Sequence, residues 1–150
     1  MTNYARFGAM IATSTIVMFG LMYLNTFQLD HIRLSETRVY MALIMGATMA
    51  IIMLSFMLGM YQKRGVNIVI FAGSVMVFIA SLWLVRSQQT VDQVSWMKAM
   101  IPHHSIAILT SERATITDPR VRELADQIIQ SQREEIVQME RLIDELDNAK

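Results

Sequence analysis

Residues 39–61 read VYMALIMGATMAIIMLSFMLGMY, 23 residues without one charged side chain. A helix needs about 20 consecutive apolar residues to cross the hydrocarbon core of a membrane. The stretch does not alternate apolar and polar residues as a membrane strand would, and only a helix or a closed barrel satisfies the backbone in lipid. It therefore predicts a transmembrane helix.

Two further apolar stretches flank this one, at residues 7–27 and 66–85, and neither contains a charge. Tyrosine and tryptophan side chains stand near the ends of all three, as at a membrane interface. The first stretch is too long for the apolar part of an ordinary signal peptide, and no small-x-small cleavage site follows it, so we interpret it as a retained anchor. The sequence predicts a transmembrane domain over residues 1–86, with spans at about 7–27, 39–61 and 66–85.

The charges next to the spans indicate an orientation. Three spans place the two ends of the chain on opposite sides, and Lys63 and Arg64 share a side with Arg6. The positive-inside rule puts that side in the cytoplasm, although Arg86 and Lys98 count against it. We expect a protein of the bacterial inner membrane, with a cytoplasmic N-terminus and an extracytoplasmic C-terminal part.

The composition of the C-terminal part excludes several functions. Residues 87–150 contain eleven acidic and seven basic side chains, so a basic surface for nucleic acid is absent. The chain has no cysteine, which excludes disulfides and thiolate metal sites. With 14 methionines, a site for a soft metal would use Met thioethers and His imidazoles.

Apolar residues in residues 87–150 recur at steps of three and four, the pattern of two amphipathic helices. Asp118 and Pro119 between them suit the N-cap and the first position of the second helix. So short a connection predicts an antiparallel hairpin domain, and hence an all-α protein. One hairpin buries little core, so we expect a homo-oligomer, most simply a dimer that completes a four-helix bundle. The predicted inner faces are Val91, Val94, Met97, Ile101, His104, Ile108, Ser111 and Thr115, then Val121, Ala125, Ile128, Gln132, Met139, Ile143 and Leu146.

The hairpin brings potential metal ligands to one inward-facing zone. Folding it near residues 117–118 places Gln132 opposite the His103–His104 pair and Glu135 opposite Met100. Thioether with imidazole suits Cu(I) or Ag(I), whereas imidazole with carboxylate suits Cu(II) or Zn(II). The alternative is ordinary packing, because Met at a helical seam is usually core and a buried His is usually hydrogen-bonded. The predicted ligands are Met97, Met100, His103, His104, Glu135 and Met139, with Gln132 orienting them and His31 from the first connection as a further candidate.

The run Met100-Ile101-Pro102-His103-His104, followed by Ala125-Asp126-Gln127-Ile128-Ile129, Gln132, Glu135-Ile136 and Met139, resembles the signature of the domain-of-unknown-function family 305. The resemblance covers about residues 90–147. It implies a ferritin-like helical fold, an extracytoplasmic location and, as for some members, copper binding and copper resistance. Two features depart from the family pattern. The His pair continues as Ser105-Ile106-Ala107-Ile108-Leu109 without a methionine, and the chain holds one hairpin where many relatives hold two.

Methionines also repeat along the second span, beside the small residues Ala42, Gly46 and Ala50. Helical packing or contact with lipid explains such a stripe. The alternative is a thioether conduit for Cu(I) across the membrane. The residues of this ladder are Met41, Met45, Met49, Met53 and Met57.

The sequence predicts a membrane-anchored protein that binds copper or silver in metal homeostasis or resistance, with Cu(I) favoured and Ag(I), Cu(II) or Zn(II) as alternatives. Its expected partners are membrane lipid, a second copy and copper-handling proteins. The alternative is a metal-independent scaffold or oligomerisation module. We expect no enzymatic activity, because the Glu-x-x-His pairs of di-iron bundles, the His-Glu-x-x-His zinc motif and an activated nucleophile are all missing.

Overall fold

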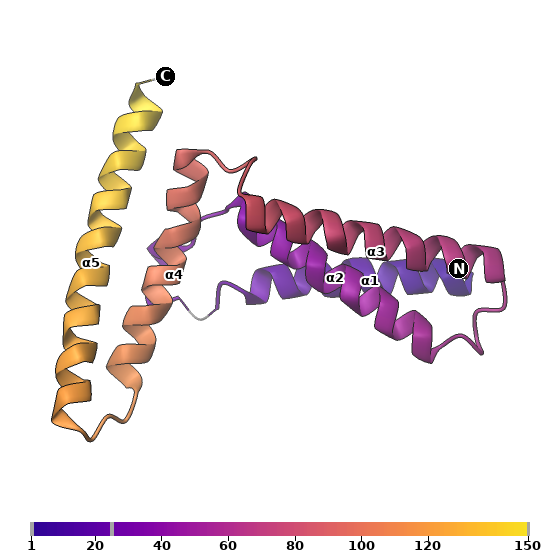
Figure 1. The fold of residues 1–150 in the computed structure, drawn as a ribbon, viewed down its shortest axis with the longest axis horizontal. Coiled ribbons are helices and arrows are strands. Elements are labelled where there is room, and N and C mark those ends of the chain that lie inside the picture. Colours follow the sequence, from indigo (N-terminus) through magenta and orange to yellow (C-terminus); the bar gives the residue numbers. More distant parts are fainter. Residues whose placement is uncertain (1, 25, 150) are drawn as a thin grey trace. The chain divides into compact units, whose positions relative to one another are not determined.

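The computed structural model describes residues 2–24 and 26–149, and these residues form helices and no strand. The prediction of an all-α fold is therefore confirmed. Figure 1 shows the order of the elements along the chain. They are α1 (Asn3–Leu21), the short 3₁₀ turn η1 (Leu29–His31), α2 (Glu36–Phe56), α3 (Arg64–Ser87), α4 (Gln93–Arg113) and α5 (Pro119–Asn148).

Helices α1, α2 and α3 are long and apolar enough to cross a membrane. Their bounds differ most from the predicted spans at the C-terminal ends of α1 and α2. Helix α1 ends at Leu21 rather than at residue 27, and α2 ends at Phe56 rather than at residue 61. Beyond the two helix ends, the aromatic residues Phe27 and Tyr61 pack into apolar clusters.

The chain divides into two compact units. The first, here called the apolar unit, contains α1, α2 and α3. Its apolar cluster joins Phe7, Leu54 and Tyr61. The Tyr4 hydroxyl donates to Asn67 Oδ1 at 2.9 Å, and Asn67 Nδ2 donates to the Tyr61 carbonyl at 2.6 Å. These polar bonds tie α1 to the link between α2 and α3.

The small residues of α2 allow α1 to approach closely. Ala42, Gly46 and Ala50 are buried, and a Cβ atom added at Gly46 would collide with the side chain of Thr15. This agrees with the close helix contact that the small-residue stripe predicts.

The methionine ladder lies along the surface of α2. Met45, Met49 and Met53 line an apolar groove of about 410 Å³, and Met53 and Met57 also pack against the apolar cluster. Packing accounts for part of the ladder, and the copper conduit stays a prediction.

The second unit, here called the hairpin unit, contains α4, α5 and the connection Tyr23–Glu36. Figure 1 shows α4 and α5 as neighbouring helices joined by a short turn. Asp118 caps α5 through a bond from the Arg120 amide, and Pro119 opens the helix, as predicted. The apolar core consists of Val94, Met97, Ile101, Ile108, Ile136, Met139 and Ile143.

Part of the predicted inner face of α5 differs from the observed one. Val121 and Ile128 are 49% and 37% exposed, whereas Ile136 is buried. The connection Tyr23–Glu36 also packs on the hairpin, although the sequence placed residues 23–36 in the transmembrane domain. Phe27 packs against the hairpin core, and His31 is buried. Three segments of chain, rather than two helices alone, therefore position the candidate site.

Candidate metal centre

Helix α4 carries the His pair on two different faces. The helix runs without a break through Pro102, which removes one backbone donor in the turn before the pair. Consecutive residues of a helix differ by about 100°, so His104 points into the hairpin while His103 is exposed. Their ring centroids are 6.2 Å apart. His104 is therefore the histidine that the fold holds in place.

Both ring nitrogens of His104 have partners. Nδ1 lies 2.9 Å from the Met100 carbonyl oxygen, and Nε2 lies 2.7 Å from Glu135 Oε2 on α5. A carbonyl oxygen only accepts, so Nδ1 carries a proton and donates it. The Nε2 atom consequently faces the carboxylate either as the second N–H of an imidazolium or as a bare lone pair.

Glu135 is fixed on its other side by its own helix. The Ser131 hydroxyl, one turn earlier, donates to Glu135 Oε1 at 2.8 Å. The bonds from Ser131 and from His104, in that order, lower the pKa of Glu135 below its ordinary value of 4.5. The carboxylate is therefore charged at neutral pH, with one oxygen directed at His104.

The 2.7 Å between Nε2 and Oε2 is a hydrogen-bond distance. A metal ion does not fit between the two atoms at that distance and would have to displace the hydrogen-bonding proton. Histidines that bind metals commonly donate their other N–H to a backbone carbonyl, as His104 does to Met100. With that hydrogen bond opened, the pair would offer one nitrogen and one oxygen donor to a metal ion.

The other predicted ligands fall into two groups. The exposed His103 and the half-buried Met100 lie on the same stretch of α4 as His104. Met97 and Met139 are 5% and 7% exposed within the apolar core. Within residues 2–24 and 26–149, no group of three or more His, Asp or Glu side chains converges. A metal held in one hairpin would therefore draw further donors from Met100 or His103.

The orienting residue differs from the predicted one. Gln132 is half-buried, and its side chain makes no hydrogen bond to any described residue, whereas Ser131 holds Glu135. The spacing of four residues between Ser131 and Glu135 was visible in the sequence and is the signal that identifies such a bond on a helix.

A second polar contact, not predicted from the sequence, docks the connection onto α4. Ser105 is fully buried, its Oγ accepts from the Phe27 amide at 2.7 Å, and the same oxygen lies 2.8 Å from His31 Nδ1. His31 thus bonds to the residue next to His104. Ser105 stands four residues after Ile101 on the inner face, and a polar residue at such a position is the available signal.

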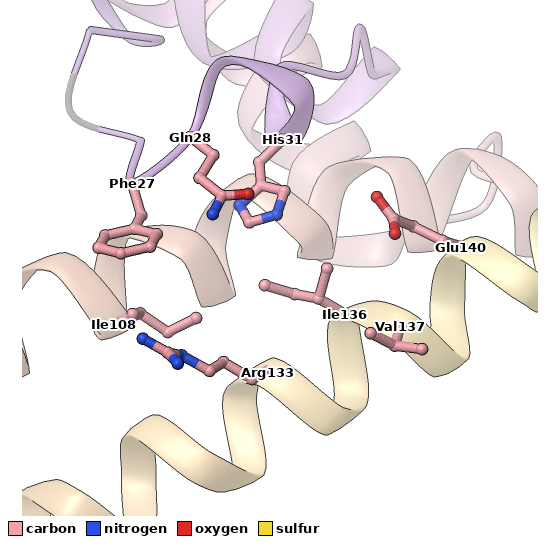
Figure 2. Close-up of a pocket in the computed structure, with 8 residues that line it drawn as sticks. All are labelled: Phe27, Gln28, His31, Ile108, Arg133, Ile136, Val137 and Glu140. Atoms are coloured by element: carbon pink, nitrogen blue, oxygen red, sulfur yellow. The ribbon is translucent and has the colours of Figure 1, made fainter.

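A pocket of about 500 Å³ opens beside this contact. Figure 2 shows the Phe27 and His31 side chains pointing from the connection toward the hairpin, with Arg133 and Glu140 on α5. The charges at its rim are already paired. Arg133 contacts Glu112 at 2.6 Å, and Arg33 contacts Glu140 at 3.6 Å. The pocket therefore offers no unpaired arginine to a ligand.

The comparisons with known proteins cover both units. The family model described as Domain of unknown function (DUF305) matches residues 83–149, which include α4 and α5. An uncharacterized protein of Acanthamoeba polyphaga mimivirus is 33% identical over 144 residues, spanning 91% of this chain and 93% of the relative. No solved structure matches the chain. The resemblance inferred from the His pair and its neighbours is confirmed, and the chain belongs to the DUF305 family.

Proposed function

We propose that this protein is a membrane-anchored copper-binding protein whose hairpin captures or buffers copper on the extracytoplasmic side of a bacterial inner membrane. The observation that carries the proposal is the arrangement of His104, with Nδ1 bonded to the Met100 carbonyl and Nε2 directed at the Glu135 carboxylate. In this proposal the three apolar helices are the anchor, and the hairpin has no catalytic role.

The donor atoms at this site favour copper over other metals. Imidazole nitrogen and carboxylate oxygen suit Cu(II) or Zn(II), and the thioether of the half-buried Met100 adds affinity for Cu(I) or Ag(I). Met97 and Met139 are packed in the core, which weakens the case for an all-thioether Cu(I) site. We assign His104 and Glu135 as the central ligands of copper and His103 and Met100 as the supporting ones.

A competition titration with a chromophoric copper chelator tests the proposal. The full chain in detergent micelles is the right sample, because the connection Tyr23–Glu36 belongs to the hairpin unit. The informative variants are His104→Ala and Glu135→Gln. Glu134→Gln, at the adjacent exposed residue, is the matched control for Glu135→Gln, and His103→Ala tests a supporting ligand.

Loss of a bond that only supports a ligand costs about 10- to 100-fold in metal affinity. We expect His104→Ala and Glu135→Gln to lose at least that much affinity for copper, His103→Ala to lose less than His104→Ala, and the control Glu134→Gln to bind copper as the wild type does. Four variants that all bind copper as tightly as the wild type would contradict the assignment.

A metal-independent scaffold is the second candidate, and one observation favours it. The contact of His104 Nε2 with Glu135 Oε2 at 2.7 Å is a complete hydrogen bond, and it joins α4 to α5 without any metal. In that case the hairpin serves as an oligomerisation module, and its role is to form the predicted homodimer. A ligand that binds only the folded state must stabilise it. Equal thermal stability with and without saturating copper would favour the scaffold.

A further inference from the structure

The connection Tyr23–Glu36 has an inner and an outer set of side chains. The inner set meets the hairpin: Phe27 packs against its core, and His31 bonds to Ser105. The outer set consists of large aliphatic side chains that are exposed, three of them over most of their surface. Their exposed fractions are 78% for Leu24, 82% for Leu29, 40% for Ile32 and 71% for Leu34.

The local backbone separates the two sets. In η1, Leu29 is exposed while His31 is buried. Beyond it burial alternates, because Ile32 and Leu34 are exposed while Ser35 is buried. Alternation with a period of two places Ile32 and Leu34 on the same side of an extended segment. The aliphatic side chains are thus directed outward by the same backbone that directs His31 inward.

Exposed leucines are ordinary when they are scattered, but several within one short connection mark an interaction site. The chain itself indicates the partner. Leu24 follows the last residue of α1 closely, and Leu34 precedes the first residue of α2. An extended chain covers at most about 3.6 Å per residue, so Leu24 lies within about 11 Å and Leu34 within about 7 Å of a helix end. The polar layer on each side of the hydrocarbon core is about 5–8 Å deep.

We propose that Leu24, Leu29, Ile32 and Leu34 insert into the interfacial layer of the lipid bilayer, so that the connection is a lipid-bound platform carrying the hairpin on its inner side. This inference rests on the membrane-spanning part of the proposed function and is independent of copper. Leucine and isoleucine at the boundary between headgroups and acyl chains are typical of segments that lie in the membrane plane. A bilayer is favoured over a second copy as the partner because both ends of the connection continue into apolar helices.

Site-directed spin labelling tests the platform directly, because the chain contains no cysteine. Single variants Leu29→Cys and Leu34→Cys of the full chain would carry a nitroxide in vesicles made of equal parts phosphatidylcholine and phosphatidylglycerol. Collisions with oxygen, which partitions into lipid, are then compared with collisions with a water-soluble nickel chelate. Asp30→Cys, in the same connection, and Val137→Cys, 66% exposed on α5, are the water-facing controls. Val69→Cys, 70% exposed on α3, reports the apolar helices.

We expect labels at positions 29 and 34 to favour oxygen over the nickel chelate by several-fold relative to labels at positions 30 and 137. Water-like behaviour at 29 and 34 beside lipid-like behaviour at 69 would overturn the platform and leave the membrane anchor intact. Dipolar broadening between labels at position 29 would also overturn it, because a second copy would then cover the leucines. A water-like label at 69 would refute both the platform and the anchor, whereas the copper content of the same vesicles tests metal binding separately.

Discussion

His104 brings one imidazole nitrogen within 2.7 Å of a carboxylate oxygen of Glu135. The Met100 carbonyl fixes the proton on Nδ1, and Ser131 fixes the direction of Glu135. The side chains on both sides of the 2.7 Å contact are therefore held in place by hydrogen bonds of their own. Such preorganisation is what a metal site needs from its protein, and it is also what makes a good ion pair.

The pKa of Glu135 should respond to its two donors. We expect Ser131→Ala and His104→Ala each to raise it toward 4.5, with the larger rise for Ser131, whose hydrogen bond is the larger cause of the lowering. Carbon NMR of labelled glutamate measures the change. The pKa of Asp118 is also lowered, by Arg120 at the hairpin turn, and should not move in either variant. A Glu135 pKa that stays unchanged in both variants would contradict the described contacts.

The lowered pKa of Glu135 also fixes how the stability of the folded chain depends on pH. The unfolded chain binds a proton at Glu135 more readily than the folded one does. The contribution of Glu135 to stability is therefore fully present above about pH 4.5 and disappears as the pH falls through its lower, folded-state pKa. The contribution of Glu135 to stability is small, because its carboxylate is exposed and water screens its interactions.

At the scale of elements, the hydroxyl of Ser105 on α4 forms the hydrogen bonds that hold the connection Tyr23–Glu36. Replacing Ser105 by Ala would leave the Phe27 amide and His31 without their partner. Leaving a buried donor unsatisfied costs about 1–3 kcal/mol. We expect Ser105→Ala to speed hydrogen exchange of the connection and to lower the unfolding temperature, while Ser111→Ala on the same helix changes neither. Equal exchange in the two variants would mean that the connection does not depend on Ser105.

The contact between α1 and α2 depends on the absence of a side chain at Gly46. A methyl group there would collide with Thr15, and overpacking typically costs about 1–3 kcal/mol. We expect Gly46→Ala to lower the thermal stability of the chain in micelles, and Thr15→Ala in the same chain to restore it. Gly73→Ala serves as the control because nothing lies within 4 Å of its added atom. A Gly46→Ala variant as stable as Gly73→Ala would show that the two helices do not meet there.

The existence and type of the helices could be predicted from the sequence because their signals are local. Charge-free stretches indicated α1 to α3, and the Asp118–Pro119 pair indicated the start of α5. Their ends could not be predicted as well, because Phe27 and Tyr61 are as apolar as the helices they follow. Only their partners in the folded structure show that they leave the helix.

At the candidate site too, features with a local sequence signal could be predicted, and features that depend on packing could not. The sequence placed His104 and Glu135 in one zone, but it put Gln132 opposite His104 and Glu135 opposite Met100, whereas His104 bonds to Glu135 in the structure. The choice of Ser131 over Gln132 could not be predicted either, since it depends on which side chain reaches Glu135 after packing. His31 and Ser105 are 74 positions apart, and no local sequence pattern predicts a contact between residues so distant in the chain.

At the scale of the whole molecule, the hairpin occurs together with the apolar helices. The relative from mimivirus matches 91% of the chain, so it shares the sequence of both units. In the proposed function, the apolar unit holds the protein in the membrane and the hairpin unit handles copper. The connection Tyr23–Glu36 belongs to the hairpin unit while its ends continue into α1 and α2, so it links the two tasks along the chain.

Elemental analysis tests the central claim, copper at His104, most directly. The full chain would be purified from copper-supplemented cells as wild type, His104→Ala and His103→Ala, with correct folding verified by circular dichroism. The account predicts stoichiometric copper in the wild type, a near-complete loss in His104→Ala and a partial loss in His103→Ala. Equal copper in the wild type and in a folded His104→Ala variant, or a folded wild type without copper, would contradict it.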